Sequence, residues 1–455
     1  MRPQLLFFYT DWCPLCPVIR GHLEGLGEAL ADAPEVIPIN FDEEDARAKQ
    51  YEVLGVPTVV ATLGGETIEA LAGAREAEDY MELAKTALAF AKPAATVSLC
   101  MIVKNESKTL ARCLDAVKDV VDEINIVDTG SSDDTRDIAL RYTDRVFDFT
   151  WCDDFSAARN FSFAKATGDF ILWLDADDVL PDADARRFAR LKHELDGVDT
   201  VMMRYAIAFD EAGNETFSYY RERLIRRDPP RFWSEPVHEY LPILGQVRQT
   251  EITIQHRKIP SEAAGDGTRN LRIYARQLAE GRELTARGQY YYARELKTHG
   301  RYQDAIAQFS QFLGGGKGWV EDNICACVQL ADCYSALKQP AKARMILLTS
   351  FVYDTPRAEA CCRLGYLYKE ESDYPRARFW FELALSLTKP DSYGFIEHAY
   401  WDYIPLAECV VCYAQLGDID QAEAYNERAA AVRPDSASVA HNRAYFKALR
   451  AGEAK

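Results

Sequence analysis

The N-terminal part of the chain alternates short apolar runs with amphipathic segments. Apolar runs of about five residues that end at turn residues are typical of buried strands, and apolar residues three or four apart are typical of helices. Gly64 and Gly65 predict a hairpin turn between two such runs. The elements predicted here are strands 5–9, 36–41, 59–63 and 67–70, a helix from about Pro17 and a helix over 76–91.

Strands and helices alternate regularly after a break at residues 92–95. This alternation is typical of a parallel sheet with crossover helices, which binds ligands at the carboxyl ends of its strands. Polar clusters follow three of the strands, at 104–106, 128–135 and 175–178. The predicted strands are 97–103, 123–127, 145–149 and 170–174, and the helices are 106–118, 134–142 and 155–166.

From Gly288 onward the apolar positions are spaced as in helices, and a pattern repeats. Four alanines mark corresponding points roughly 34 to 45 residues apart, a period typical of paired-helix repeats: Ala305, Ala343, Ala377 and Ala422. The pattern resembles tetratricopeptide repeats over about residues 288–450. Stacked helix pairs form a concave face that usually binds a peptide or protein. A purely structural helical cap is the alternative.

Composition agrees with a globular protein, since 48% of the 455 residues are hydrophobic and 27% are charged. This length fits two or three domains, and the patterns favour three. A net charge of −18 disfavours nucleic acid and anionic membranes as partners. The longest apolar run, 97–103, is too short to span a bilayer, and the N-terminal run is too short for a secretory signal. We therefore expect a cytoplasmic protein.

The twelve cysteines are of two kinds. Cys13 and Cys16 form a CxxC pair just after a predicted strand, at the start of a helix, where the helix dipole lowers the pKa of a thiol. A zinc site in the helical region is an alternative for the others, but their close pairs lack a knuckle glycine. We expect seven of them to be buried as small apolar residues: Cys325, Cys327, Cys333, Cys361, Cys362, Cys409 and Cys412.

The N-terminal residues resemble the thioredoxin family over about residues 4–92. TrpCysProLeuCys at 12–16 stands where the family has its redox motif, and Pro57 stands where it has a cis-proline facing that motif. The resemblance implies a redox-active dithiol at Cys13 and Cys16. The family's buried acid is replaced by Phe7 and its neighbouring lysine by Pro38, so the proton relay is missing. A docking module with an incidental CxxC is the alternative.

Asp175 and Asp177 follow the buried strand 170–174 and should therefore face one crevice. Charged groups at the end of a buried strand need a ligand or partner, because desolvation of an unpaired charge is costly. A hard divalent cation held by one or two carboxylates and substrate phosphates satisfies this need. We expect Mg²⁺ or Mn²⁺, which neutralises charge on a leaving nucleotide.

Four segments in order resemble the inverting GT-A glycosyltransferases of family 2: 98–106, 126–135, 158–160 and 168–178. A helix-capping turn with residues 131–133 is an alternative role for Asp128. For Lys104 and Glu106, the alternative is that both are simply surface charges. The resemblance implies that Asp128 contacts the nucleotide base and that Lys104 and Glu106 border the nucleotide pocket. Arg159 would lie near the phosphates. Asp175 would contact the ribose and the metal, and Asp177 would be the direct metal ligand.

His238 and Glu239 follow an aromatic, proline-rich segment. His238 resembles the metal ligand that many GT-A enzymes supply late in the domain, and a neutral imidazole suits Mn²⁺. A structural histidine is the alternative. Inverting transfer also needs a carboxylate base, and we favour Glu239 over Glu235 and Asp210. Four arginines form a basic segment: Arg221, Arg223, Arg226 and Arg227. One of them could reach a diphosphate, although ion pairing to the many acids is the simpler expectation.

These features predict a multidomain protein with a thioredoxin-like α/β domain at 1–93, a GT-A α/β domain at 96–258 and a tetratricopeptide-like all-α domain at 270–455. We expect transfer of a hexose from a UDP-linked sugar to a peptide or protein, with cysteine as a candidate acceptor. The combination resembles sublancin-type peptide S-glycosyltransferases, in which an attached dithiol would keep the acceptor cysteine reduced. The alternatives are a polysaccharide or lipid-linked glycan transferase and a scaffold with an inactive transferase domain.

Overall fold

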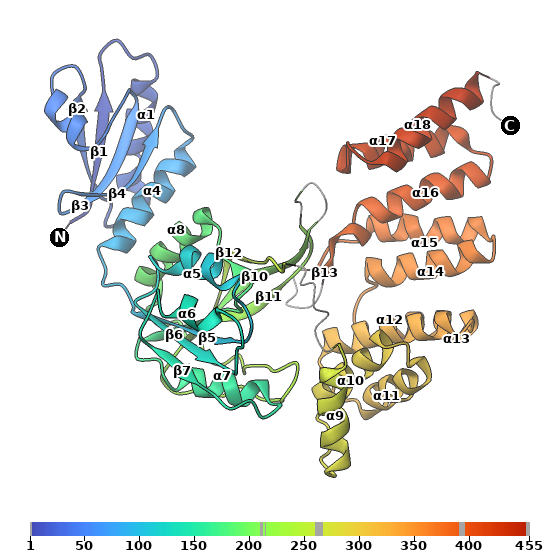
Figure 1. The fold of residues 1–455 in the computed structure, drawn as a ribbon. Coiled ribbons are helices and arrows are strands. Elements are labelled where there is room, and N and C mark those ends of the chain that lie inside the picture. Colours follow the sequence, from blue (N-terminus) through green and yellow to red (C-terminus); the bar gives the residue numbers. More distant parts are fainter. Residues whose placement is uncertain (1, 210–212, 214, 260–266, 391–395, 452–455) are drawn as a thin grey trace.

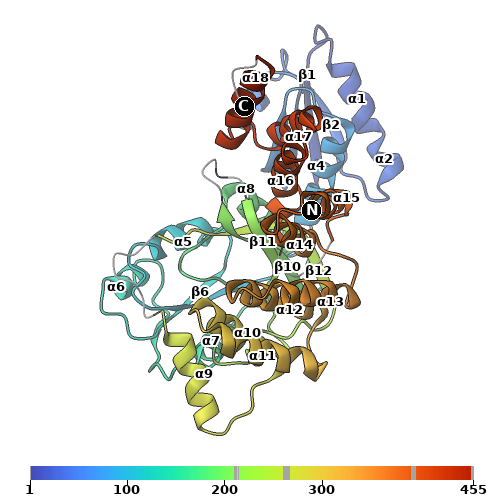
Figure 2. The same cartoon turned by 90° about the vertical axis from the view of Figure 1, so that its right-hand side faces the viewer.

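The computed structural model describes residues 2–209, 213, 215–259, 267–390 and 396–451. These residues form a small α/β domain, a larger α/β domain and a stack of helices, in chain order (Figure 1). The small domain and the last helices of the stack both project upward from the middle domain, in two views at right angles (Figures 1 and 2). The predicted multidomain fold class is confirmed.

The first domain contains a four-stranded sheet in the order β2-β1-β3-β4. The predicted strands and long helix are confirmed, whereas two short helices of 4 and 6 residues, α2 and α3, are too short to leave a periodic pattern. The strands are β1 (Gln4–Tyr9), β2 (Glu35–Asn40), β3 (Thr58–Leu63) and β4 (Glu66–Ala72). Helices α1 (Cys16–Glu24), α2 (Leu26–Ala29) and α4 (Ala77–Phe90) pack on one face, and α3 (Asp45–Gln50) packs on the other.

The middle domain is built on a mixed sheet in the order β7-β6-β5-β8-β11-β10-β12-β9. Its first four strands in that order are parallel, as predicted: β5 (Val97–Val103), β6 (Glu123–Asp128), β7 (Val146–Asp148) and β8 (Phe170–Trp173). The remaining strands extend the sheet beyond β8, where β11 runs antiparallel to it: β9 (Asp178–Val179), β10 (Thr200–Phe209), β11 (Glu215–Arg226) and β12 (Val247–His256).

Helices cover the faces of this sheet, and the first of them is shorter than predicted. The expected helix 106–118 begins only at Leu110, because the preceding residues form a turn in which Asn105 has φ 56°. The amide N–H of Glu106 donates to Thr135 Oγ1 (2.7 Å), which ties this turn to the segment after β6. The helices are α5 (Leu110–Val117), α6 (Thr135–Ala139), α7 (Phe155–Phe163) and α8 (Asp182–Leu191), followed by a 3₁₀ turn (Lys192–Glu194).

The C-terminal region is a stack of helix pairs, as its sequence period predicts. The four marker alanines are each the fourth residue of the second helix in a pair, and all are 0% exposed, so the two helices of a pair approach closely there. Helix α9 (Arg269–Ala279) precedes the pairs α10 (Ala286–Thr298) with α11 (Tyr302–Gly315), α12 (Val320–Ala336) with α13 (Pro340–Thr349), α14 (Ala358–Glu370) with α15 (Tyr374–Ser386), and α16 (Tyr403–Gln415) with α17 (Ile419–Val432); α18 (Ala437–Arg450) ends the stack.

Several cysteines predicted to be core residues lie inside this stack. Six of the seven are buried and Cys325 is partly buried, so the expectation that they replace small apolar residues is confirmed. No helix in the part of the chain that the structure describes is long and apolar enough to cross a bilayer.

The domains are joined by specific contacts. Strand β13 (Ile396–Glu397), from the connection between α15 and α16, pairs antiparallel with β11 of the middle domain. On the opposite side, Phe90 of α4 stacks on His193 at 4.4 Å between ring centroids. Arg190 of α8 also contacts Glu82 of α4. The helical stack therefore lies against the β10–β11 side of the sheet, and the first domain lies against α8 (Figure 1).

Candidate active site

A cavity of about 650 Å³ opens between the middle domain and the first helices of the stack. Its walls include residues that follow β5 and β8 on one side, and residues of α9 and α10, such as Asn270 and Arg287, on the other. Most of the site residues predicted from the sequence line it: Lys104, Glu106, Arg159, Asp175, Asp177, His238 and Glu239. The structure therefore brings together residues from four separate segments of the sequence.

Arg159 of α7 is buried between two aromatic rings and two carboxylates. Its guanidinium carbon is 5.0 Å from the ring centroids of both Trp173 and Trp233. Its Nη2 donates to Asp175 Oδ1 (2.8 Å) and its Nε donates to Glu239 Oε1 (2.7 Å). Burial alone would raise the pKa of Asp175, but the charges of Arg159 and Arg223 and the hydrogen bond from Arg159 together outweigh it and hold that pKa at about 2. Arg159 thus fixes both carboxylates at the cavity wall.

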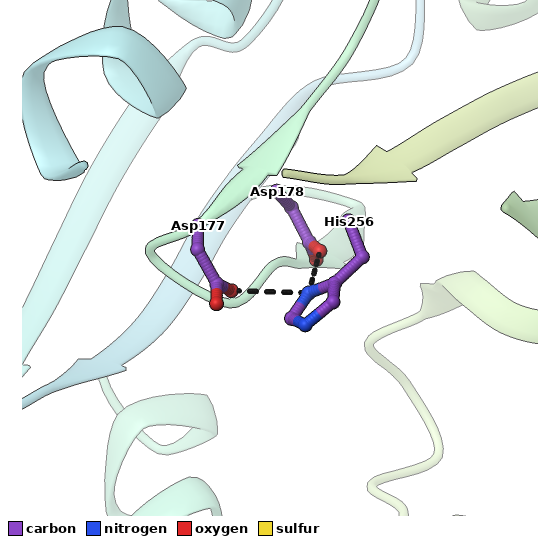
Figure 3. Close-up of side chains that lie close together, drawn as sticks. All are labelled: Asp177, Asp178 and His256. Atoms are coloured by element: carbon purple, nitrogen blue, oxygen red, sulfur yellow. Dashed lines mark ion pairs between the residues drawn. The ribbon is translucent and has the colours of Figure 1, made fainter. Parts of the chain in front are cut away.

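Asp177, Asp178 and His256 form a group whose ligand atoms all lie within 4.8 Å of one another (Figure 3). His256 Nδ1 is 3.3 Å from Asp177 Oδ1 and 3.6 Å from Asp178 Oδ1. The hydroxyl of Tyr205 donates to Asp178 Oδ1 (2.9 Å) and lies 3.0 Å from His256 Nδ1. Hydrogen bonds to the two carboxylates raise the pKa of His256 to about 10. The proton that His256 carries thus offsets part of the negative charge of the two aspartates.

The two aspartates of this group differ in how they are compensated. Asp178 is fully buried and its Oδ2 lies 3.0 Å from Nη1 of Arg223, which is also 0% exposed. The same Oδ2 accepts a hydrogen bond from the amide of Asp175 (3.0 Å). Asp177 lines the cavity and has only His256 as an ion-pair partner among the described residues. Asp177 and His256 are therefore the pair available to a cation, and one carboxylate with one imidazole suits Mn²⁺ or Mg²⁺.

His238, which the sequence predicts to be a metal ligand, does not belong to this group. Its Nε2 lies 2.8 Å from Glu295 Oε1, and its ring stacks on Tyr291 at 4.4 Å. Both partners are on α10, so His238 connects the middle domain to the helical stack although it lines the cavity. His256 was missed because it reaches Asp177 only through the pairing of β12 with β9, where His256 faces Asp178. No local pattern indicates that pairing.

Asp128 forms a tight turn with the residues that follow it, but it does not cap a helix, because α6 begins only after Asp134. Its Oδ1 accepts hydrogen bonds from the amides of Gly130 (3.2 Å) and Ser131 (2.9 Å) and from the Ser131 hydroxyl (2.7 Å). Its neighbour Thr129, and not Asp128 itself, lines the cavity. Contact with a nucleotide base stays a prediction for Asp128.

Lys104 and Glu106 lie at the cavity wall beside the acidic group. The side chain of Lys104 is exposed and has no ion-pair partner among the residues described. Burial, together with the charges of Asp177 and Asp175, raises the pKa of Glu106, while the Thr109 hydroxyl donates to its Oε2 (2.6 Å). Lys104 is thus a cation available to a ligand, and Glu106 is a further acidic side chain close to Asp175 and Asp177.

The basic segment on β11 is mostly structural. Arg223 pairs with Asp178, Arg226 with Asp199, and Nε of Arg227 donates to the carbonyl of Gly168 (2.7 Å). Arg221 lines the cavity but is paired with Glu222 (3.0 Å). Glu235, a weaker candidate for the base, accepts from Thr285 of the stack, and Asp210 lies outside the described residues. Glu239 is the remaining candidate from that set.

The CxxC pair lies where the sequence predicts it, after β1 and at the start of α1. Cys13 and Cys16 form a disulfide, and both are buried, while the neighbouring Trp12 is 69% exposed. The Val56–Pro57 peptide bond is cis. Phe7 and Pro38 are directly paired between β1 and β2, so two apolar residues occupy the place of the missing acid and lysine.

Three family models match the chain, one for each of its three domains. The thioredoxin model matches residues 1–86, the glycosyl transferase family 2 model matches residues 98–244, and the tetratricopeptide repeat model matches residues 358–391. The chain therefore combines a thioredoxin domain, a glycosyltransferase domain of family 2 and tetratricopeptide repeats.

Curated relatives match different parts of the chain. A thioredoxin of Streptomyces clavuligerus is 32% identical over 74 residues, 16% of this chain and 68% of the relative, and through this domain the chain belongs to the thioredoxin family. A TPR repeat-containing protein of Synechococcus elongatus is 42% identical over 145 residues, 32% of this chain and 35% of the relative. The glycosyltransferase SunS of Bacillus phage SPbeta is 35% identical over 114 residues, 24% of this chain and 27% of the relative. The matches thus span about a third or less of these last two relatives.

Proposed function

We propose that the middle domain transfers a hexose from a UDP-linked sugar to a cysteine of a peptide or protein, with inversion at the anomeric carbon and with Mn²⁺ or Mg²⁺. The observation that carries the proposal is the cavity itself, in which Asp177, His256 and the Arg159-bound carboxylates meet. The family 2 model over residues 98–244 and the similarity to a glycosyltransferase support it.

Asp177 and His256 would hold the ion in this proposal, and the metal role predicted for His238 passes to His256. Two protein ligands leave other positions for diphosphate oxygens and water, as is usual for a cation that binds with a nucleotide. A bound divalent ion supplies charge neutralisation on the leaving diphosphate. Lys104 adds a positive charge at the same wall, where it can contact the nucleotide.

Arg159 acts in this proposal as an organiser rather than as a phosphate contact. Its Nη2 and Nε already donate to Asp175 and Glu239, and its guanidinium lies between two tryptophan rings. The arrangement orients Asp175 towards the ribose and Glu239 towards the acceptor side of the cavity. A buried arginine with two carboxylate partners is well suited to hold such a geometry.

Glu239 is the proposed base, and a carboxylate base suits a thiol acceptor better than a hydroxyl. Only Oε1 of Glu239 is used by Arg159, and the side chain lines the cavity. A carboxylate side chain is in general a weak base. A cysteine thiol, with an ordinary pKa of about 8.5, gives up its proton far more readily than an alcohol does. A weak base beside the cavity is therefore sufficient for cysteine.

The thioredoxin domain fits this acceptor, because a cysteine must be reduced before it can act as a nucleophile. Transfer of electrons from the Cys13/Cys16 dithiol to an acceptor disulfide gives two acceptor thiols and the Cys13–Cys16 disulfide, which an external thioredoxin reductant must reduce again. Fusion raises the effective concentration of the dithiol near the transferase. The helical stack would hold the acceptor peptide next to the cavity.

The proposal is tested with a panel of nucleotide sugars, measured for Mn²⁺-dependent hydrolysis and for transfer to a reduced cysteine peptide. We expect one UDP-linked hexose to be hydrolysed and transferred. Asp177→Asn should abolish both reactions, because the side-chain volume is kept while the charge at the cation position is lost. Asp182→Asn, an exposed acid on α8, is the matched control. Turnover by Asp177→Asn at the parent rate would refute the metal assignment, and no hydrolysis of any sugar by the parent would refute the proposed activity.

A further inference from the structure

A second hollow of about 500 Å³ lies beside the catalytic cavity. The two share four wall residues: Tyr219, Arg221, Arg287 and Tyr291. Arg287 forms the partition between them, with its guanidinium 4.6 Å from the Tyr291 ring and 5.3 Å from the Tyr240 ring. Its Nη2 donates to the Tyr291 hydroxyl (3.3 Å). A group in this side pocket is therefore separated from the catalytic cavity by the thickness of one side chain.

The walls of the side pocket are mainly apolar and aromatic. They come from both domains: Met202, Tyr219, Tyr220, Tyr240, Leu241, Pro242 and Ile243 of the middle domain, and Tyr291 and Trp319 of the helical stack. Ile243 is 42% exposed and Trp319 is 48% exposed, although both are large apolar residues. Single exposed apolar residues are common, but two at one mainly apolar hollow indicate a binding site.

Asp322 is the polar feature of this pocket. It is 7% exposed and lines the pocket from the first turn of α12. Its side chain has no hydrogen-bond or ion-pair partner among the described residues. Burial raises the pKa of Asp322, although the charges of Arg287 and Arg294 oppose this effect. The other two acids of the wall are paired, Glu222 with Arg221 and Glu321 with Arg357.

A buried carboxylate without a partner is costly, and a hydrogen-bond donor on a ligand removes that cost. The pocket therefore combines apolar walls with one acceptor group that awaits a donor. This combination suits an amino-acid residue with a large apolar side chain, whose backbone N–H or indole N–H can donate to Asp322. It suits a diphosphate less well, because Glu222, Glu321 and Asp322 would place three acidic groups near its negative charge.

We propose that this side pocket binds a large apolar residue, aromatic or aliphatic, that neighbours the glycosylated residue in the acceptor peptide, with Asp322 accepting a hydrogen bond from it. The proposal rests on the proposed function, since it takes the adjoining cavity as the place of transfer. The shared wall residues place the two hollows side by side, and neighbouring residues of an extended peptide are about 3.8 Å apart at their Cα atoms. Trp319 would then be the main apolar contact contributed by the helical stack.

The test measures binding without transfer. The probes are the capped pentapeptides acetyl-Gly-Trp-Ser-Trp-Gly-amide and acetyl-Gly-Ala-Ser-Ala-Gly-amide, in which serine replaces the acceptor cysteine so that no disulfide exchange occurs. Their dissociation constants are measured by isothermal titration calorimetry on the full chain, without nucleotide sugar or metal. We expect the tryptophan peptide to bind at least about tenfold more tightly than the alanine peptide.

Three variants identify the pocket. Trp319→Ala and Asp322→Ala should each weaken binding of the tryptophan peptide by about tenfold, and Val352→Ala, an apolar residue 81% exposed elsewhere on the stack, should not. Thermal unfolding checks that each variant is folded, and if Asp322→Ala is not, the exposed Trp319 decides the result. Equal affinity of the parent for the two peptides, or full affinity in Trp319→Ala, would overturn the proposal. Displacement of the peptide by uridine would also overturn it, because the pocket would then belong to the donor.

Failure of this proposal and failure of the proposed function give different results. Peptide binding is measured without donor, so a parent that binds the tryptophan peptide but hydrolyses no nucleotide sugar contradicts only the transferase activity. A parent that hydrolyses a nucleotide sugar but does not distinguish the two peptides contradicts only the side pocket.

Discussion

Replacement of His256 by alanine separates the two histidines that compete for the metal role. We expect His256→Ala to raise the Mn²⁺ concentration for half-maximal nucleotide-sugar hydrolysis by at least about 100-fold. Loss of a residue that merely orients a metal ligand already costs about 10- to 100-fold in affinity, so loss of a direct ligand should cost no less. His238→Ala is the matched control, and it should leave this concentration unchanged.

The structure also predicts how the two variants affect stability. In His256→Ala the buried carboxylate of Asp178 keeps Arg223, the Tyr205 hydroxyl and the Asp175 amide as partners, so the domain should remain folded. In His238→Ala the hydrogen bond with Glu295 and the stacking on Tyr291 are lost. His238 is about a third exposed and Glu295 keeps the amide of Asn270 as a donor, so we expect a loss of about 1 kcal/mol.

The assay is a metal titration of hydrolysis, combined with calorimetric titration of Mn²⁺ into the protein saturated with UDP. Urea unfolding gives the change in the free energy of unfolding of each variant. Metal binding that is unchanged in His256→Ala and weakened in His238→Ala would refute our reassignment and restore the prediction made from the sequence.

Two other variants test Arg159 and the Cys13/Cys16 dithiol. Arg159→Met should lower the free energy of unfolding by about 3 kcal/mol, measured by urea unfolding, because it leaves Asp175 and Glu239 without their shared cation; a loss below 1 kcal/mol would contradict the buried pairing. The Cys13→Ser, Cys16→Ser double variant should glycosylate a reduced cysteine peptide at the parent rate, but lag behind the parent when the peptide starts as a disulfide and a thioredoxin reductant is supplied. Identical rates on the oxidised peptide would favour a docking role for the first domain.

Local patterns were sufficient for most of the fold. The strand over 97–103 agrees with β5 to the residue, because a continuous apolar run ended by a charged cluster has one simple interpretation. The four marker alanines identified equivalent positions in four helix pairs, since only a small side chain permits the close approach seen there. The strands β10 to β12 were not predicted. Each of them borders the cavity or the edge of the sheet, and their apolar positions are interrupted by residues such as Arg223 that are buried for a specific partner.

The site was predicted less completely than the fold, for a physical reason. Asp175 and Asp177 could be found because they follow a buried strand directly in sequence. His256 lies far from Asp177 in the sequence. The two side chains meet only because β9 and β12 pair antiparallel over two residue pairs. Arg159 was placed near the phosphates by resemblance, whereas its burial between Trp173 and Trp233 depends on tertiary packing that no local pattern contains.

The segment that connects Trp233 to Tyr240 explains why the helical stack belongs to the active site. Glu235 accepts from Thr285 on the stack, and a Cβ at Gly288 would lie only 3.3 Å from its Oε2, so the two domains approach closely here. His238 contacts Glu295 on the stack, and the next residue, Glu239, contacts Arg159 in the middle domain. Glu235 and His238 also have positive φ angles, which side chains rarely adopt unless their contacts hold them. The position of the proposed base is therefore set from both domains at once, and an acceptor bound along the helices lies against the same segment that carries it.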